Sequence, residues 1–557
     1  FKIKMLMKNL FKLITLMPMM VSFQAYTAQP DAGQIIKEIE LNAPKVVKDK
    51  LLIKPNQPIV EDKDIPKIEI KKFYIINNKA LSSKEILAFL DKFVGKQVTV
   101  NGLNEIVNEL SNYYRDLGFL AQASLPDQDV TVGNVLINIT EGNFAGVEVT
   151  TVDGNDSHID PEYVKKFFES HGLNKILSLH VVDRKVLIFN RNHGVEATSS
   201  LAAGDYEGDT KVLIQLENLP RFDSVFNLDN YGSRTTGRTR GLYSLNWNNP
   251  IGTGEQLQAI YMKTEGVDFI SLGYDVPIGY DGLRANLTVG YMEYEVIHGE
   301  YEDNDINGDS LSFQGKFNYP IKISSEGFMD VVAQFSNRSF VNDSGSITLS
   351  EFDTNVAKFG IEGSYIDYML LEGASNNYGI FLHTGDVDYA GSTENGLFTK
   401  LTFEYERLQY IDSYWSASFQ ISGQIADSNM NSSEQFYLGG PTGIRAYPVS
   451  EGGGTHGILS TIEIARSLPY ALEAKAFYDM GAIKQVKDRY SGDNVTKNSY
   501  SLKGYGAGLE WRAPNDSYLG VTWSHRIGGN PNKQSDGSDQ DGGHKENFIW
   551  LNGHITF

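Results

Sequence analysis

Two short segments carry the residues whose types and spacing favour a specific electrostatic contact. Gly439–Pro448 reads Gly-Gly-Pro-Thr-Gly-Ile-Arg-Ala-Tyr-Pro, and Phe477–Gly481 reads Phe-Tyr-Asp-Met-Gly. The glycines that begin the first segment predict a turn, which presents the guanidinium of Arg445 beside an aromatic ring. A guanidinium offers a planar set of donors that can pair with a carboxylate such as Asp479 through two hydrogen bonds. The two segments therefore predict an ion pair that fixes a loop to a strand.

Both segments resemble motifs of the Omp85 superfamily of outer-membrane proteins. The run Ile444, Arg445, Ala446, Tyr447 resembles the Val-Arg-Gly-Tyr/Phe tip of the long sixth barrel loop, and Phe477, Asp479 and Gly481 match the strand motif that receives this tip. The resemblance implies that Gly439 and Gly440 are the hinge of the loop. Ala446 replaces the usual glycine, and its β-carbon restricts the backbone.

The whole chain resembles the transporter of a two-partner secretion system, the type that exports filamentous haemagglutinins and haemolysins. This resemblance implies that the loop at about 436–457 enters a barrel, where Arg445 pairs with Asp479. Shielding by Tyr447 and Phe477 would make this pair worth more than the roughly 0–1 kcal/mol of an exposed pair, and the sequence leaves open which case applies. The alternative is that Arg445 is a surface loop residue and Asp479 a lumen charge without a partner; the presence of both motifs in the right order argues against it.

Composition excludes several classes of protein. The 557 residues carry a net charge of −21, which argues against nucleic acid as a partner, and no cysteine, which excludes disulfides and thiolate metal sites. Tyrosine, phenylalanine and glycine are abundant, yet mean hydropathy is −0.30. A membrane barrel has this profile, because its apolar residues alternate with polar ones.

The first residues predict three segments of different character. Residues 1–28 have lysines, then the short apolar run 13–21 and small residues, as a secretory signal peptide has. Residues 29–42 predict an amphipathic helix with Asp31 as N-cap, and the resemblance makes it a plug of the pore. The lysine- and proline-rich residues 43–66 predict a linker.

Residues 67–220 mix helical and strand periods. The stripe from Leu103 to Leu117 has the period of a helix, and alternating runs follow it. Tyr114–Phe119 and the ending Glu141-Gly142 resemble a POTRA domain. We predict two such α+β domains at 67–144 and 145–220, although one larger α+β domain would also fit.

From about Arg221 only the two-residue period remains. The 337 residues of 221–557, at roughly 20 residues per strand and connection, predict about 16 antiparallel strands in a membrane all-β barrel. Such a barrel is too wide for its own side chains to fill, so loop six and the plug helix are its expected occupants. The alternating final strand ending in Phe557 resembles the assembly signal of outer-membrane barrels.

The resemblance implies a function and a set of partners. We expect a translocation pore in the outer membrane of a Gram-negative bacterium, with the POTRA domains in the periplasm. It would export a large β-helical exoprotein, which the POTRA domains recognise, and would contact outer-membrane lipid and the barrel-assembly machinery. A barrel-assembly insertase of the same superfamily is the alternative, and a passive porin fits less well because it needs no periplasmic domains.

Motifs for catalysis and cofactor binding are missing from the sequence. It has no Walker A loop, no His-Glu-x-x-His and no Gly-x-Ser-x-Gly, and its histidines lack metal-ligand spacing. We therefore expect no enzymatic activity, no cofactor, no metal and no bound nucleotide.

Overall fold

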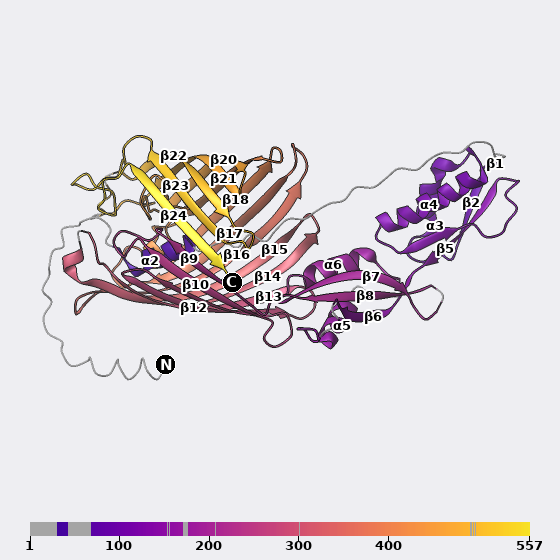
Figure 1. Cartoon of the computed structure of the whole chain (residues 1–557), viewed down its shortest axis with the longest axis horizontal. Helices are drawn as coiled ribbons and strands as arrows, with labels where there is room; N and C mark the ends of the chain where they lie inside the picture. The colour runs from indigo at the N-terminus through magenta and orange to yellow at the C-terminus, as the bar shows by residue number, and fades with distance from the viewer. Residues whose placement is uncertain are drawn as a thin grey trace.

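The chain forms a large β-barrel, a helix inside it and two α+β domains that extend from one end (Figure 1). The computed structural model describes residues 30–42, 68–152, 154, 156–170, 176–206, 208–299, 301–490, 493, 495 and 497–557. The predicted signal peptide (1–28) and linker (43–66) lie outside these residues. Across the described residues, no helix has the length and apolar character needed to cross a membrane.

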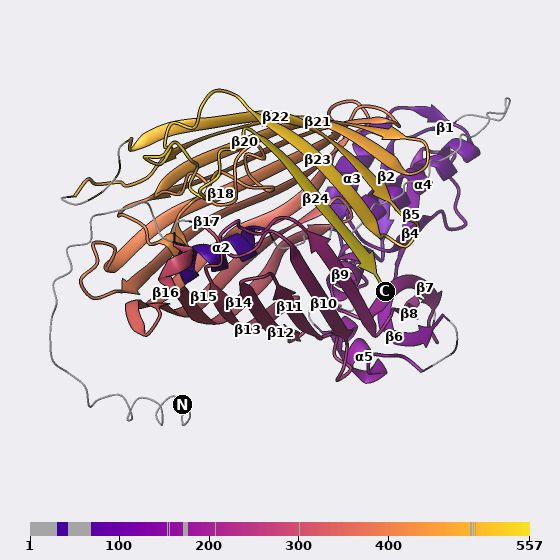
Figure 2. The same ribbon diagram turned by 60° about the vertical axis from the view of Figure 1, so that its left-hand side comes forward.

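Helix α2 (Ala32–Leu41) lies inside the barrel (Figure 2). It begins where the sequence predicts, because the carboxylate of Asp31 accepts a hydrogen bond from the backbone N–H of Gln34 at 2.8 Å. Ile35 and Ile36 are buried against apolar side chains of the barrel wall. The apolar face of the predicted amphipathic helix is thus buried against the inner wall of the barrel.

The first α+β domain packs helices on a three-stranded sheet of order β2-β5-β4. Ser82 and Glu85 form a capping box at the start of α3, and Thr99 caps α4. The apolar stripe of α4, from Leu103 to Tyr114, is buried against the sheet. The elements are β1 (Ile68–Glu69), β2 (Lys72–Ile76), α3 (Ser83–Leu90), β3 (Gln97–Val98), α4 (Val100–Asp116), β4 (Ala121–Ser124) and β5 (Asn134–Glu141).

The second α+β domain repeats this pattern in the sheet β6-β8-β7. In each three-stranded sheet the first strand along the chain pairs in parallel with the last, and the middle strand pairs with the last antiparallel; β1 and β3 of the first domain form a separate antiparallel pair. Strand β7, rich in serine and alanine, was not predicted. The elements are β6 (Asn143–Thr151), α5 (Pro161–Glu169), α6 (Leu179–Phe189), β7 (Val195–Ala203) and β8 (Asp209–Asn218).

The barrel is a closed ring in which every neighbouring pair of strands is antiparallel, from β9 round to β24, which pairs with β9 again. Alternate residues point outward, so leucines, isoleucines and aromatic residues cover the outer surface. The 16 strands are β9 (Phe222–Asp229), β10 (Arg240–Asn248), β11 (Gln256–Lys263), β12 (Val267–Ile278), β13 (Leu283–Glu295), β14 (Ile306–Ser324), β15 (Gly327–Ser344), β16 (Ile347–Asp367), β17 (Ala374–Asp388), β18 (Gly396–Tyr410), β19 (Trp415–Ala426), β20 (His456–Leu468), β21 (Leu472–Lys484), β22 (Ser499–Arg512), β23 (Tyr518–Arg526) and β24 (Asn547–Thr556).

Phe557 lies at the seam that closes the barrel. Its backbone N–H donates to the carbonyl of Ser224 on β9 at 2.9 Å, while its side chain stays exposed. The last residue of the chain thus extends the pairing between the last and first strands.

The second α+β domain is fixed to one end of the barrel, which we call the domain end. Arg191, at the end of α6, forms two hydrogen bonds with the buried carboxylate of Asp330 on β15. The ammonium of Lys185 on α6 donates to the carbonyl of Tyr280, in the turn between β12 and β13, at 2.9 Å. The domain is therefore held by charged contacts at several strands.

Candidate functional site

The wall of the site is the hairpin of β20 and β21, in which Thr461 lies opposite Asp479 and Glu463 lies opposite Phe477. Asp479 is completely buried, whereas Met480 beside it is exposed on the outer surface. Since alternate residues of a strand face opposite sides, Phe477 and Asp479 share the lumen face. The strand therefore directs one carboxylate into the barrel.

The loop that meets this wall connects β19 to β20 and spans 427–455. It starts earlier than the predicted 436, and its short 3₁₀ helix η3 (Ser432–Glu434) precedes the tip. Residues 456–457, which we predicted in the loop, already belong to β20. A bridge between Phe436 and Gly454 holds the two arms of the loop together.

Gly439 and Gly440, the predicted hinge, form the neck of the tip. Gly440 has a φ of +117°, and a β-carbon on Gly439 would lie 2.3 Å from the carbonyl oxygen of Pro448. The backbone N–H of Ile444 returns to the carbonyl of Leu438 at 2.7 Å. Both glycines are thus needed where the chain folds tightly onto itself.

Arg445 at the tip lies against Asp479. Its Nη2 is 2.8 Å from Oδ1 and its Nε is 3.0 Å from Oδ2, and its backbone N–H also donates to Oδ2 at 3.1 Å. Thr461 donates to Oδ1 from the neighbouring strand at 3.0 Å. Four hydrogen bonds therefore satisfy one buried carboxylate, which makes the contact specific in geometry as well as in charge.

Further contacts fix Arg445 from its other sides. The guanidinium lies 3.2 Å from the ring centroid of Phe477, and its Nη1 is 2.9 Å from the carboxylate of Glu463. The carbonyl of Arg445 accepts hydrogen bonds from Ser524 at 2.5 Å and from the indole of Trp550 at 2.8 Å. Four strands (β20, β21, β23 and β24) thus contact one residue of the loop.

Glu463 was missed in the sequence. It shares the lumen face of β20 with Thr461, while Ile462 and Ile464 face outward and are exposed. The available signal was an acidic residue between the two apolar residues Ile462 and Ile464. The sequence alone did not show that the register of β20 and β21 places Glu463 beside Phe477.

Ala446, the departure from the family motif, is completely buried against β22. A β-carbon on Gly504 would lie 2.5 Å from the β-carbon of Ala446, and one on Gly506 would lie 2.4 Å from the ring of Phe477. Ala446 is absent from the residues with positive φ, so its backbone does not require glycine. The β-carbon of Ala446 therefore fits because Gly504, which faces it on β22, has no side chain.

Of the two aromatic residues that could shield the Arg445–Asp479 pair, Phe477 lies against Arg445, whereas Tyr447 lies against a different cation. Its ring is completely buried and lies 4.3 Å from the guanidinium of Arg526 on β23. Arg526 in turn forms two hydrogen bonds with Asp539, at 3.0 and 2.6 Å, in the loop between β23 and β24 (527–546). Tyr447 thus belongs to a second contact region, nearer the end of the barrel away from the domains.

This second contact region ties loop six to the loop 527–546. Glu451 accepts hydrogen bonds from the side chain of Asn530 and from the backbone N–H of Gln540, both at 2.9 Å. Burial raises the pKa of Glu451 to about 7, and the nearby carboxylates of Asp539 and Asp541 act in the same direction. We call the set Glu451, Arg526, Asn530 and Asp539 the outer tie; nothing in the sequence motifs pointed to it.

Helix α2 lies between loop six and the barrel wall. Glu38 accepts from Ser450 at 2.6 Å, and Asp31 accepts from Ser432 at 2.7 Å. Burial raises the pKa of Glu38 above its ordinary value, although the hydrogen bond from Ser450 acts against this. The helix therefore rests on both arms of the loop.

The opposite side of α2 contacts β14 and β15. The backbone N–H of Ala32 donates to Asn342 at 2.9 Å, and Glu40 pairs with Arg338 at 2.5 Å. Arg338 also lies 3.6 Å from Glu434 of loop six, which Lys400 contacts at 2.7 Å. Arg338 therefore keeps a carboxylate partner on the loop independently of the helix.

Comparison with protein families decides what this assembly is. Residues 208–511 match the family described as haemolysin secretion/activation protein ShlB/FhaC/HecB. The chain belongs to this family. Residues 68–142 match the POTRA domain of ShlB type. The protein is thus an outer-membrane transporter of two-partner secretion, which works with a secreted exoprotein, and its domain end faces the periplasm.

Named relatives agree with this family. The heme/hemopexin transporter protein HuxB of Haemophilus influenzae strain 86-028NP is 25% identical over 454 residues, which are 78% of this chain and 79% of HuxB. The outer membrane transporter CdiB of Escherichia coli is 23% identical over 253 residues, 44% of this chain and 41% of CdiB.

Solved structures show the same fold. CdiB from Escherichia coli superposes with a TM-score of 0.71 at 17% identity, covering 95% of this chain and 96% of that one. BamA from Haemophilus ducreyi lacking POTRA domains 1-3 gives a TM-score of 0.50 at 12% identity, covering 88% of this chain and 100% of that one. This chain thus shares its barrel architecture with both CdiB and BamA.

Proposed function

We propose that this transporter exports a large β-helical exoprotein, such as an adhesin, a haemolysin or a contact-dependent toxin, as an extended chain through the barrel lumen. The observation that carries the proposal is that two separate pieces, loop six and α2, occupy the lumen and are held in different ways. An extended chain needs a passage, and a helix held by single hydrogen bonds and one partly exposed ion pair can leave to provide one. We assign the Arg445–Asp479 pair the role of keeping loop six in place during passage.

The periplasmic domains would receive the exoprotein before it enters the lumen. Sheets β2-β5-β4 and β6-β8-β7 each leave strands at their edges, and an edge strand can pair with an extended segment through main-chain hydrogen bonds. Such pairing tolerates many side chains, which suits a long repetitive client. The second domain is fixed to the barrel, so a segment held there lies close to the pore.

Neither catalysis nor a nucleotide is part of this proposal. Folding of the exoprotein outside the cell would prevent backward sliding and so drive export. The exposed apolar outer surface of the barrel would contact outer-membrane lipid, and the final strand with Phe557 would be read by the barrel-assembly machinery.

Co-production with exoprotein candidates encoded near its gene tests the proposal. A Gram-negative host that lacks other two-partner exporters should display or release one of these proteins only when the transporter is present. Arg445→Ala and Asp479→Ala should assemble as barrels and lose most of this export. Full export by both variants would remove the role assigned to the pair, and no export by the unaltered transporter would remove the proposed function.

A passive porin is disfavoured by the filled lumen. A porin would carry steady current in a planar bilayer, whereas a barrel closed by loop six and α2 should show low conductance with brief openings. Steady conductance of the unaltered protein would contradict the export proposal.

A further inference from the structure

Three neighbouring turns at the periplasmic end expose large apolar side chains. They connect β16 to β17 (368–373), β18 to β19 (411–414) and β20 to β21 (469–471). Met369 and Tyr470 are 86% and 88% exposed, which is unusual for such residues. We call the following set the apolar rim: Tyr368, Met369, Leu370, Leu371, Tyr414 and Tyr470.

The backbone of the apolar rim is also in a costly conformation. Leu371, Tyr470 and Ala471 have φ values of +51°, +65° and +57°, in the left-handed region that residues with a β-carbon rarely adopt. The turn between β12 and β13 uses glycine for this purpose, and the turn between β22 and β23 (513–517) uses Asp516. Leucine and tyrosine thus occupy positions that glycine or asparagine would fill with less strain.

The first turn of the rim is held firmly in spite of its exposure. The side-chain amide of Gln409 donates to the carbonyls of Leu370 and Gly373, both at 2.8 Å, and the backbone N–H of Gly373 donates to the carbonyl of Leu370 at 3.1 Å. The apolar side chains are therefore presented by a structured turn.

Polar side chains separate the rim from the lipid-facing band. On the outer face of β18, Arg407 follows the exposed Leu397 and Leu401, and it pairs with Asp367, the last residue of β16, at 2.7 Å. On β20, Arg466 follows the outward-facing Ile462 and Ile464 in the same way. Charged groups avoid the hydrocarbon core, so the rim lies beyond it on the periplasmic side.

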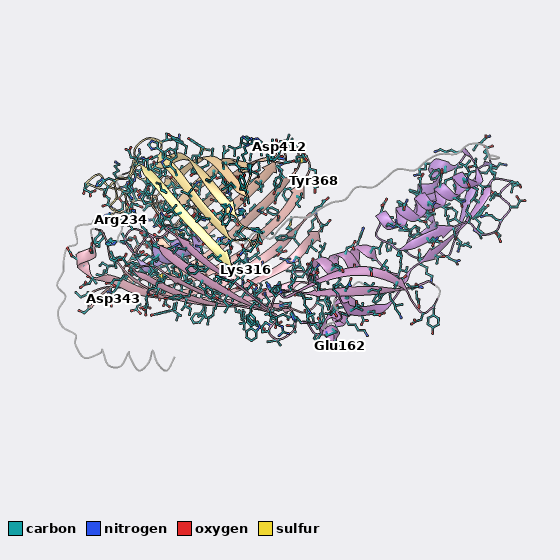
Figure 3. The ribbon with its side chains drawn as sticks, in the orientation of Figure 1. Glu162, Arg234, Lys316, Asp343, Tyr368 and Asp412 are labelled. Atoms are coloured by element: carbon teal, nitrogen blue, oxygen red, sulfur yellow. The ribbon has the colours of Figure 1, made fainter. Side chains whose placement is uncertain are left out.

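The rim and the second POTRA domain occupy different arcs of the same mouth. The domain contacts the ends of β10 to β15, through Asn249, Tyr280 and Asp330 among others, whereas the rim lies at the ends of β16 to β21. Figure 3 shows Tyr368 and Asp412 at the end of the barrel from which the domains extend, with Arg234 and Asp343 at the other end. The rim thus lies at the same mouth of the barrel as the second POTRA domain.

We propose that the apolar rim is a docking surface for the exported polypeptide in its extended, unfolded form. This inference rests on the proposed function and adds an entry site to it. An unfolded β-forming chain exposes apolar side chains at every second position, and exposed leucine, methionine and tyrosine contact them with little demand on sequence. The contact is weak at each position, so the chain can move on.

Because the chain has no cysteine, single cysteines can locate the rim. Met369→Cys and Tyr470→Cys would carry a bimane label in vesicles of brominated phospholipid, with Ile462→Cys as a lipid-facing control and Asn515→Cys as a control in a polar turn. Aqueous iodide should quench the rim labels and brominated lipid should not. Lipid quenching equal to that at Ile462 would show a membrane anchor and overturn the proposal.

A rim variant tests the effect on export. Met369→Ser, Leu370→Ser, Leu371→Asn and Tyr470→Asn together remove four of the six apolar side chains of the rim. Asparagine suits a positive φ, so the barrel should be as stable as before. Export by this variant should fall about five- to tenfold, the factor that corresponds to losing about 1–1.4 kcal/mol of contact.

Its control is Ile347→Ser, an exposed apolar residue at the opposite end, which should export normally. Export by the rim variant equal to that of the unaltered protein overturns the inference and leaves the proposed function standing. If the unaltered protein exports nothing, the proposed function itself has failed.

Discussion

Loop six and helix α2 occupy the same lumen but are held by different kinds of contact. Arg445 of the loop has a bidentate partner in the completely buried Asp479, a stacked ring and two donors on its carbonyl. The helix has single hydrogen bonds to both arms of loop six and to β15, and Glu40, its partner for Arg338, is partly exposed. A partly exposed contact contributes less than a buried one whose loss leaves a lone charge.

This difference indicates that loop six is the fixed occupant of the lumen and that α2 is the removable one. A helix of 10 residues is only marginally stable alone, so α2 can unfold once it leaves. Its departure leaves Arg338 with Glu434 as partner, so no buried cation is abandoned. Withdrawal of loop six would leave Asp479 without any cation.

The largest expected effect comes from breaking the loop-six contact. Asp479→Ala leaves Arg445 without its main partner in a buried site, which should cost about 3–5 kcal/mol of barrel stability. Glu463→Gln, which keeps a polar group beside the guanidinium, should cost clearly less. Thermal unfolding followed by the gel mobility of the folded barrel measures both, and equal losses would mean that Asp479 is not the main anchor.

A smaller effect should come from the packing of the tip. Gly504→Ala places a β-carbon 2.5 Å from that of Ala446, and such overpacking should cost about 1–3 kcal/mol. Ala446→Gly in the same chain should restore most of the loss. A double variant as unstable as Gly504→Ala alone would show that the tip does not meet β22 as described.

Removal of α2 should change conductance far more than stability. Deleting 32–41 takes away the helix and its contacts with Ser450 and Arg338, while the Arg445 contact stays intact. Planar-bilayer recordings should show larger and longer openings, with an unfolding temperature close to that of the complete chain. A large drop in unfolding temperature would mean that the helix supports loop six.

The outer tie should give the smallest effect, as a pH dependence. The pKa of Glu451 is about 7 in the folded site against an ordinary 4.5, so its contribution is complete below pH 4.5 and is lost as pH rises through 7. Hydrogen exchange of the loop 527–546 should therefore speed up between pH 5 and 8, beyond the intrinsic rise. In Glu451→Gln the exchange rate should rise with pH only as fast as the intrinsic rate does. If the additional rise persists in this variant, another group causes it.

Sequence reasoning was strongest where a local pattern carries the information. The two-residue period from Arg221 predicted about 16 strands, and the barrel has 16. The paired motifs predicted that Arg445 and Asp479 would meet, and the structure places them 2.8 Å apart. The role of this pair stays a prediction until export is measured.

Contacts between segments far apart in the chain could not be predicted from the sequence. The partners of Tyr447 depend on the register of β22 to β24 and on the path of the loop 527–546, so Arg526 and Asp539 could not be chosen among many charges. The accommodation of Ala446 by Gly504 depends in the same way on which strand lies opposite the tip. Strand alternation shows which face a residue takes and not what it meets there.

A reversible tether between α2 and loop six tests most directly whether the helix is the removable plug. A β-carbon on Gly33 would lie 3.0 Å from that of Ser433, which is shorter than the 3.5–4.5 Å of a disulfide, and 2.7 Å from the hydroxyl of Ser432, so the helix must shift slightly away from the loop for the bond to form. The chain has no cysteine of its own to interfere. Oxidised Gly33→Cys/Ser433→Cys should neither export nor open, and a reductant should restore both. Full export with the disulfide intact would show that the exoprotein passes without the helix leaving.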